Sequence, residues 1–350
     1  MAYNNNNNNN NYNKKIVVFG ATGSVGTDLI EIVSNNEPAW EIVAVSRSGP
    51  NTNTRLASLN LPNVDIVKGD VEDLESAKQI TNDADMVFSC VGFVQYEQKY
   101  WVEHWPKVVD NLLAVTSIDC PLIFCDNLYA YGNPTTSITP STRTLPAGMK
   151  TKPAIRSLLR VKLTRRMKEA PGSIVAVGGS DIFGPHIDDA KSHLGGTMVG
   201  KMVDGKRPTC LVSRKIHHDF CYSRDFANAL YVVSKEENRP VSMGRFWICP
   251  HAIHNKTYDD IKDMINDNLD QRAPCGFQVV PSWLLYGVGA VDPVAFEMRE
   301  MMHIWRSDYT VDAGEFESEF GVSATAAHLA LKETVGAWKA RGVDSTQAAQ

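Results

Sequence analysis

The sequence predicts a doubly wound α/β fold, in which helices cover both faces of a parallel sheet, together with a smaller C-terminal lobe. From Lys15 onwards, short runs of apolar and β-branched residues alternate with amphipathic segments. The apolar runs are nearly continuous, which is typical of strands buried on both faces. After Gly184 the alternation gives way to stretches punctuated by glycine and proline. That change favours a separate lobe.

Each element follows from its local pattern, because apolar residues at a spacing of two predict strands and apolar residues at helical spacing predict helices. In the first half we expect strands within 15–20, 41–47, 64–70, 86–92, 121–127 and 173–179, and helices at 24–36, 72–80, 94–116 and 153–169. The helix at 94–116 is expected to be disturbed at Pro106. In the second half we expect a helix at 223–238, strands at 244–250 and 276–280, and mostly helical segments from 256 to about 340.

These elements divide the chain into a sheet domain, a lobe and a tail. The sheet domain is expected to comprise 14–184 and 223–250, and the lobe 185–222 and 251–345. Residues 1–13 contain a run of asparagines, which cannot bury enough apolar area to offset the entropy lost on ordering. We expect a disordered tail there.

Composition excludes several classes of function. The 350 residues carry a net charge of −5 and no run rich in Lys or Arg, so we expect neither nucleic acid nor a membrane surface as partner. The N-terminal residues contain no apolar run of the length that a signal peptide or membrane span needs, which predicts a cytoplasmic protein. The seven cysteines are scattered and odd in number, as expected of reduced thiols, and Cys120 and Cys125 do not form a C-x-x-C clip. We therefore predict no metal.

The heptapeptide GATGSVG, residues 20–26, joins the first expected strand to the first expected helix. Glycines at this spacing allow a tight turn and let the backbone approach a pyrophosphate, whose charge is favoured at the start of a helix. The strand and helix on either side are the context that this motif requires, so it predicts a dinucleotide-binding domain of Rossmann type. The expected cofactor contacts in the turn are Gly20, Thr22, Gly23, Ser24, Val25 and Gly26.

The ends of the next strands predict which cofactor is bound. In such folds an acidic residue after the second strand binds the ribose 2′-OH, whereas an arginine accommodates a 2′-phosphate. This chain has Ser46 and Arg47 there, which favours NADP over NAD, although the arginine could also stack on adenine. Asp70 and Val71 follow the third strand and are expected near the adenine, the alternative being that Asp70 caps the next helix. Cys90, Val91 and Gly92 end the fourth strand and are small enough to let adenosine pass.

With these motifs the chain resembles the short-chain dehydrogenase/reductase superfamily, in particular its extended NAD(P)-dependent epimerase/dehydratase branch. The resemblance covers about residues 14–340 and also rests on the segments KGDVED, YAYG at 129–132, GGSDIFGP at 178–185 and HDFCYSRDFANAL at 218–230. It implies that Asp181, Ile182 and Phe183 line the cofactor. His218 stands where sugar-nucleotide enzymes of the branch tend to carry an arginine that pairs with the diphosphate, and a neutral imidazole is a poor substitute. We otherwise expect the histidines of the lobe, His186, His193, His217 and His218, to lie at the surface.

The resemblance also implies a Ser or Thr after the fifth strand and a Tyr-x-x-x-Lys pair on the next helix, with the tyrosine as general acid/base. In this chain those positions fall at Asn127, Lys152 and Arg156, so each is substituted. Lys152 and Arg156 keep the spacing of one helical turn. Arg156 could donate to a ribose hydroxyl, and Lys152 could serve as an acid if burial lowered its pKa. The alternative is that both belong to a basic, solvated face of the helix.

Tyr129 offers a second proton donor. It lies two residues beyond Asn127, so an extended backbone would project both side chains to one face, whereas Tyr131 would point away and pack. We predict an NADP(H)-dependent oxidoreductase or reductase that acts by hydride transfer on a small carbonyl or alcohol other than a nucleotide sugar, with Tyr129 supplying the proton and Asn127 orienting a carbonyl. An epimerase or dehydratase with transient cofactor use and a non-catalytic NADP-sensing protein are the alternatives. The helices beside the sheet could also pair two copies into a homodimer.

Overall fold

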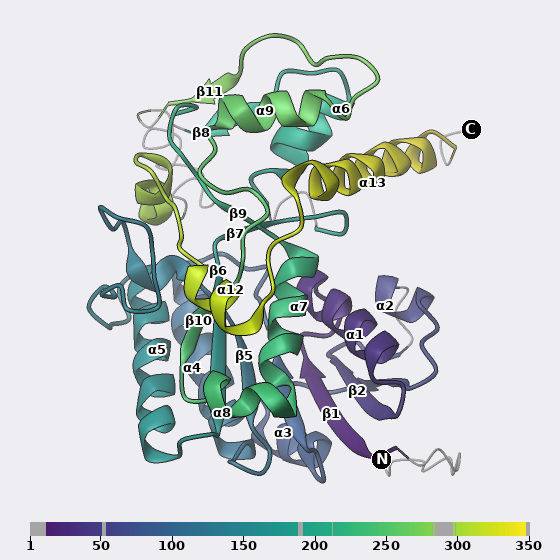
Figure 1. Ribbon diagram of the computed structural model, residues 1–350, viewed down its shortest axis with the longest axis vertical. Helices are drawn as coiled ribbons and strands as arrows, with labels where there is room; N and C mark the ends of the chain where they lie inside the picture. The colour runs from purple at the N-terminus through teal and green to yellow at the C-terminus, as the bar shows by residue number, and fades with distance from the viewer. Residues whose placement is uncertain are drawn as a thin grey trace.

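Seven parallel strands form the central sheet, in the order β10-β6-β5-β4-β1-β2-β3 (Figure 1). The computed structural model describes residues 12–50, 54–187, 192–211, 213–281, 283, 297 and 299–347, so most of the expected tail lies outside the described residues. The strands are β1 (Lys14–Phe19), β2 (Trp40–Ser46), β3 (Val64–Lys68), β4 (Met86–Ser89), β5 (Leu122–Asn127), β6 (Ile174–Gly179) and β10 (Phe246–Ile248). The predicted doubly wound α/β fold is confirmed.

The register brings the carboxyl ends of the central strands to one edge. Phe19 pairs with Ser89, and Asn127 pairs with Gly179. The strand order reverses at β1, which has β2 on one side and β4 on the other. Ligands of open α/β sheets bind outside the carboxyl ends of the strands at such a switch point. The fold therefore places a site above β1, β4 and β5.

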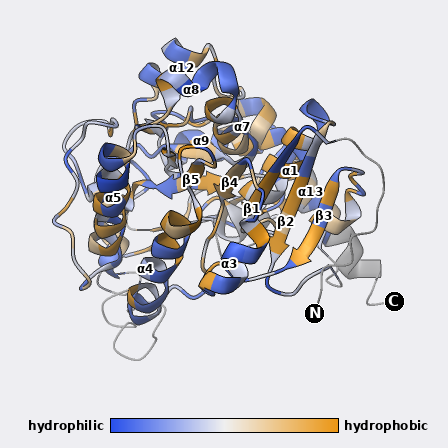
Figure 2. Ribbon diagram, turned by 90° about the horizontal axis from the view of Figure 1, so that it is seen from below, coloured by the Kyte–Doolittle hydropathy of each residue, from blue (hydrophilic) through white to orange (hydrophobic). Residues whose placement is uncertain are grey.

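Helices cover both faces of this sheet, and the alternation of side chains along each strand decides which residues they meet. Val17, Phe19 and Phe124 pack on the face covered by α3 (Leu74–Thr81), α4 (Gln98–Val115) and α5 (Lys152–Glu169). Ile16, Val18 and Ile123 pack on the face covered by α1 (Ser24–Asn36) and α7 (Ser223–Ser234). Figure 2 shows the apolar strands in orange between helices with blue outer faces. Helix α4 continues through Pro106.

The remaining elements lie outside the central sheet, and all except α9 and the 21-residue α13 are short. They are η1 (Leu128–Tyr131), α2 (Arg55–Ser58), β7 (Asp181–Phe183), η3 (Gly195–Gly200), α6 (Lys201–Val203), β8 (Thr209–Leu211), β9 (Phe220–Tyr222), η4 (Glu236–Asn238), α8 (Arg239–Ser242), α9 (Tyr258–Asn266), β11 (Gln278–Val280), η5 (Arg299–Trp305), α12 (Gly314–Phe320) and α13 (Ala327–Gln347). In Figure 1 the pair β7 and β9 lies between the sheet and the upper elements α6, α9, β8 and β11. None of the described helices combines the length and apolarity that a bilayer crossing needs.

Asp219 joins these parts of the chain. Its side chain is fully buried and accepts hydrogen bonds from the backbone N–H groups of Asn255 at 2.5 Å and Val311 at 2.8 Å. The imidazole of His254 lies 2.8 Å from the same carboxylate. A buried carboxylate must be fully partnered, and these partners are more than thirty residues away. The HDF segment at 218–220 therefore has a structural reason for its aspartate.

Candidate active site at the carboxyl edge of the sheet

The glycine-rich turn adopts the conformation that its sequence predicts. Gly20 has φ of 78°, and a Cβ there would overlap the carbonyl of Cys90. A Cβ on Gly26 would overlap the carbonyl of Gly20. Gly23 precedes α1 and has no side chain with which to cap it, so the N–H groups at the start of α1 remain for a ligand. The backbone of this turn fits a pyrophosphate group.

The other residues of the turn have different surroundings. Thr22 is exposed and Val25 is buried. The Ser24 hydroxyl donates to the backbone carbonyl of His186 at 3.0 Å, so a segment from the lobe side lies against the first turn of α1. That contact joins residues 162 positions apart and has no signal in the sequence.

The predicted adenosine contacts surround the ends of β2, β3 and β4. Ser46 is buried and its hydroxyl lies 3.1 Å from that of Ser48, whereas Arg47 is exposed. Asp70 does not cap the next helix, because the N-cap of α3 is Asp73, whose carboxylate accepts from the N–H groups of Glu75 and Ser76. Asp70 Oδ1 instead accepts from the N–H of Glu72 at 3.0 Å. The capping alternative for Asp70 is therefore wrong.

Val71 and the end of β4 complete this side. Val71 is buried, Cys90 and Val91 are half-buried, and Gly92 is exposed. A Cβ on Gly92 would meet nothing within 4 Å, so the backbone is open there. The backbone at the end of β4 is therefore unobstructed at Gly92.

Lys152 and Arg156 do not form a solvated face of α5, so that alternative is wrong. Lys152 is 0% exposed, and its Nζ lies 2.5 Å from Glu297 Oε2 and 3.2 Å from Glu300 Oε2. The ammonium also lies 4.7 Å from the centre of the Tyr96 ring. Two carboxylates therefore hold the Lys152 ammonium, and a charge held in this way is a poor candidate for proton transfer.

Arg156 is 2% exposed and forms an ion pair with Asp126. Arg160 shares that carboxylate at 3.1 Å, and the Arg156 guanidinium lies 4.4 Å from the ring centre of Trp105. The Nε and one terminal nitrogen of Arg156 are buried without a hydrogen-bond partner among the described residues. Buried donors of this kind are rare unless a ligand or water satisfies them. Arg156 therefore fits the predicted role of donor to the cofactor ribose.

Strand β5 ends at Asn127, and the chain turns into the 3-10 helix η1 instead of staying extended. Asn127 Oδ1 caps that helix by accepting from the Tyr129 N–H at 3.2 Å. The expectation of an extended run that projects Asn127 and Tyr129 to one face is therefore wrong. The backbone does not stay extended because an Asn side chain readily accepts hydrogen bonds from the N–H groups that follow it and so favours a helical turn. Tyr131 is buried, as predicted.

Tyr129 lies in η1, directly after the carboxyl end of β5. Its ring stacks on Trp101 with centres 6.4 Å apart, and its hydroxyl is hydrogen-bonded to that of Tyr96. Burial raises the pKa of Tyr129 well above that of free tyrosine, and the charge of Asp181 raises it further. The Tyr96 hydroxyl and Arg156 oppose the shift without reversing it. The Tyr129 hydroxyl therefore stays protonated at neutral pH.

Asp181 begins β7 and faces two imidazoles. Burial alone would raise the pKa of Asp181, but a hydrogen bond from His218 and the charges of His193 and His218 outweigh it and lower that pKa. His218 Nε2 lies 3.0 Å from Asp181 Oδ2. His218 is fully buried, so its expected surface position is wrong. Asp181 is therefore an anion inside the site.

The next residues of β7 are Ile182 and Phe183. Phe183 is buried and tilts against Tyr222 with ring centres 5.5 Å apart, while Ile182 is half-buried.

Four residues of the site were not recognised in the sequence: Tyr96, Asp126, Glu297 and Glu300. Glu297 and Glu300 lie 145 and 148 positions from Lys152, and no local pattern connects them.

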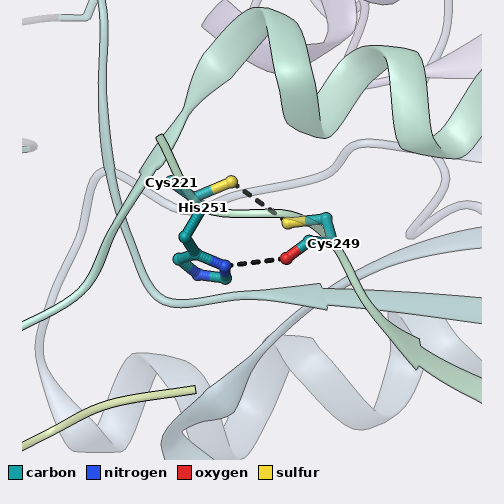
Figure 3. Close-up of side chains that lie close together, drawn as sticks. All are labelled: Cys221, Cys249 and His251. Carbon is teal, nitrogen blue, oxygen red and sulfur yellow. Dashed lines mark hydrogen bonds between the residues drawn. The ribbon is translucent and has the colours of Figure 1, made fainter. Parts of the chain in front are cut away.

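Cys221, Cys249 and His251 form a second buried cluster (Figure 3). The two sulfur atoms are 3.1 Å apart. His251 Nδ1 lies 2.7 Å from the Cys249 carbonyl, and Nε2 accepts from the Ser180 N–H at 3.0 Å. Burial lowers the pKa of His251 to about 4, so the ring is neutral. Because both ring nitrogens already have backbone partners, this cluster does not fit a metal ion.

Comparisons with known proteins agree with this geometry. The model of the NAD dependent epimerase/dehydratase family matches residues 16–249. A search of curated proteins found no match. The fold is similar to dTDP-glucose 4,6-dehydratase from Bacillus anthracis in complex with NAD, with 14% identity, a TM-score of 0.69 and coverage of 95% of this chain and 98% of that one.

Two epimerases have the same fold. UDP-glucuronic acid 4-epimerase from Bacillus cereus in complex with NAD shares 14% identity at a TM-score of 0.69, over 93% of this chain and 99% of that one. UDP-glucose 4-epimerase from Thermotoga maritima shares 13% identity at a TM-score of 0.70, over 94% and 99%. The family match spans the turn, the strand ends and the Lys152 helix described above. The chain thus belongs to the NAD dependent epimerase/dehydratase family.

Proposed function

We propose that this protein is an NADP(H)-dependent reductase of a small, uncharged carbonyl compound and that Tyr129 donates the proton. The observation that carries the proposal is the hydroxyl of Tyr129, which desolvation keeps protonated and on which the charges of Asp181 and Arg156 act. The reduced nicotinamide, when bound, supplies the hydride. Tyr129 would then protonate the resulting alkoxide, which is a far stronger base than a phenolate.

The raised pKa of Tyr129 also supports a direction for the reaction. Reduction needs an acid, and a phenol with a raised pKa can still protonate an alkoxide. Oxidation of an alcohol needs a base, and the Tyr129 phenolate is not populated at neutral pH. Lys152 cannot replace it, because Glu297 and Glu300 hold its ammonium. The site is therefore better suited to reduction.

The charges of the site support a substrate without phosphate groups. Asp181 is an anion there, Lys152 is neutralised by two glutamates, and Arg156 is paired with Asp126. His218 stands at the position where the family resemblance leads one to expect an arginine, and its side chain is directed to Asp181. A diphosphate would meet the negative charge of Asp181, and the charges of Lys152 and Arg156 are already paired with carboxylates of the protein. This chain is therefore proposed to differ in substrate from the nucleotide-sugar enzymes that it resembles in fold.

The experiment combines turnover with binding. Purified protein is incubated with NADPH and benzaldehyde, cyclohexanone or an ortho-quinone, and NADPH oxidation and formation of the alcohol or catechol are measured. We expect turnover with at least one of these carbonyls, and no saturable calorimetric binding of UDP-glucose up to about 1 mM, the upper end of ordinary KM values. Conversion of UDP-glucose would contradict the proposal and favour an epimerase or dehydratase.

A non-catalytic NADP sensor remains the second candidate, and one observation favours it. Both members of the Lys152 and Arg156 pair are bound to carboxylates of the protein, so neither provides a free charge for chemistry. A sensor would bind NADPH tightly, with no alcohol formed from any carbonyl of the panel. The same experiment therefore distinguishes the two functions.

The preference for NADP rests on Arg47, which is exposed just beyond β2 and has no acidic residue among its sequence neighbours 45–50. We expect Arg47→Ser to weaken NADPH binding about tenfold or more, because the charged hydrogen bonds to the 2′-phosphate are lost, and to leave NADH binding unchanged. Fluorescence titration of both cofactors measures this. Lys107→Ser, which removes an exposed cation of α4, is the matched control. Equal losses for NADPH and NADH would show that Arg47 stacks on adenine instead.

A further inference from the structure

Three successive backbone carbonyls after β7 accept hydrogen bonds from two different side chains, those of Arg341 and Ser24. The carbonyls of Pro185 and Ile187 accept hydrogen bonds from the Arg341 guanidinium at 2.9 Å and 3.2 Å. The carbonyl of His186, which lies between them, accepts from the Ser24 hydroxyl at 3.0 Å. We call residues 185–187 the strap. It connects the C-terminal helix α13 to the glycine-rich turn, elements more than three hundred residues apart.

The Arg341 end of this connection is rigid. The guanidinium lies 4.6 Å from the ring centre of Trp338, one turn earlier in α13. Trp338 packs so closely on Gly200 that a Cβ there would overlap its ring. The Tyr222 hydroxyl also donates to Glu333 of α13, and Leu331 and Val335 are buried in the core of the lobe. Arg341 therefore projects from a fixed helix.

The Ser24 end lies at the cofactor site. Ser24 is the first residue of α1, where the free N–H groups would meet the pyrophosphate. The strap follows directly on Asp181 to Phe183, the segment predicted to line the nicotinamide half of the cofactor. The strap thus connects the segment predicted to line the nicotinamide half of the cofactor with the turn predicted to bind the pyrophosphate.

We infer that Arg341 is a positioning residue that holds the strap over the bound dinucleotide and so controls its release. The inference rests on the cofactor binding that the proposed function requires. In this arrangement release of the dinucleotide would be coupled to separation of the His186 carbonyl from the Ser24 hydroxyl. Arg341 opposes that separation because it fixes the two neighbouring carbonyls, and hydrogen bonds from a charged donor are stronger than neutral ones.

The first test measures cofactor release from the full-length protein. NADPH is displaced by excess NADP⁺ in stopped-flow fluorescence, for wild type, Arg341→Ala and Arg341→Lys. We expect Arg341→Ala to accelerate dissociation about 10- to 100-fold, the range for lost charged hydrogen bonds, and Arg341→Lys to give an intermediate rate because an ammonium is a compact donor. Lys339→Ala is the matched control, since it removes a cation of α13 whose partner is the exposed Asp270. Dissociation from Arg341→Ala at the rate of Lys339→Ala would overturn the inference.

A double-mutant cycle separates the strap from a general weakening of the fold. If Arg341 acts through the His186 carbonyl and Ser24, Arg341→Ala should add little to the dissociation rate of Ser24→Ala. Independent multiplication of the two effects would contradict the inference. Hydrogen exchange of the peptide 183–187 in the cofactor-free protein gives a further readout, and we expect faster exchange in Arg341→Ala than in Lys339→Ala. The hydrogen-exchange readout needs no cofactor and tests the contact of Arg341 with the strap by itself. The proposed function is tested separately, because a wild type that binds neither NADPH nor NADH would refute it.

Discussion

Replacing Tyr129 with phenylalanine is expected to lower kcat for carbonyl reduction about 10²- to 10⁴-fold, the usual contribution of a positioned general acid. The substitution removes the buried hydroxyl beside Tyr96, Asp181 and Arg156 and leaves the ring on Trp101. NADPH binding should stay within about twofold of wild type, because the phenyl ring keeps its packing. Steady-state kinetics with the carbonyl reduced in the panel, together with NADPH titration, measure both effects.

The pH dependence of the wild-type rate is an independent test of Tyr129 as the proton donor. An acid acts in its protonated form, so activity is present below its pKa and is lost as the pH rises through it. Because burial raises the pKa of Tyr129, the rate of reduction should not fall until the pH exceeds about 10, the pKa of free tyrosine. A decline near neutral pH would indicate a different acid, such as a histidine of the site.

Tyr131→Phe is the matched control for Tyr129→Phe. Tyr131 belongs to the same 3-10 helix and is buried, whereas Tyr129 is half-buried, and the Tyr131 hydroxyl has no hydrogen-bond partner among the described residues. The centre of the Tyr131 ring lies 4.7 Å from the Arg160 guanidinium. We expect activity close to wild type. Equal losses in the two variants would mean that packing of η1, and not proton transfer, accounts for the effect of Tyr129→Phe.

Asp126→Asn is expected to destabilise the protein by about 3–5 kcal/mol, the cost of breaking a buried ion pair. Asp126 is 4% exposed and is shared by Arg156 and Arg160, which are themselves buried. Replacing the carboxylate with an amide leaves two buried guanidinium charges without a counter-charge. Their cation–π contacts with Trp105 and Phe246 offset only part of that loss. Urea unfolding monitored by tryptophan fluorescence measures the free energy of unfolding.

Asp110→Asn removes a carboxylate in an exposed setting and serves as the comparison. Asp110 pairs with Lys162 at 2.5 Å between α4 and α5, with 56% of the Asp110 side chain exposed. Exposed pairs contribute about 0–1 kcal/mol, so this variant should unfold close to wild type. Similar free energies of unfolding for the two variants would show that the Asp126 cluster is solvated enough to tolerate unpaired arginines.

The fold could be predicted from the sequence because its signals are local. Strands such as β1 and β6 are continuous apolar runs, and Gly20 and Gly26 occupy positions where a side chain would overlap a carbonyl. Both signals are read within a few residues, and parallel strands joined by helices have few alternative arrangements. The glycine-rich turn could be assigned to the cofactor for the same reason.

The state of the residues that replace the expected catalytic pair could not be predicted in this way. Spacing alone shows that Lys152 and Arg156 share a face of α5, but not whether that face meets water or carboxylates. Their partners come from β5 and from Glu297 and Glu300, up to 148 positions away. The backbone after Asn127 likewise differs from the extended conformation that we expected, because the Asn127 side chain caps η1.

The sequence by itself thus determined the doubly wound sheet, the dinucleotide turn and the substitution of the tyrosine and lysine. Only the tertiary structure decided what that substitution means: Lys152 is neutralised by Glu297 and Glu300, Arg156 is bound to Asp126, and Tyr129 keeps a protonated hydroxyl. The physical reason is that periodicity and turn chemistry act over a few residues, whereas the protonation and pairing of a buried charge depend on whichever distant groups the fold brings into contact with it.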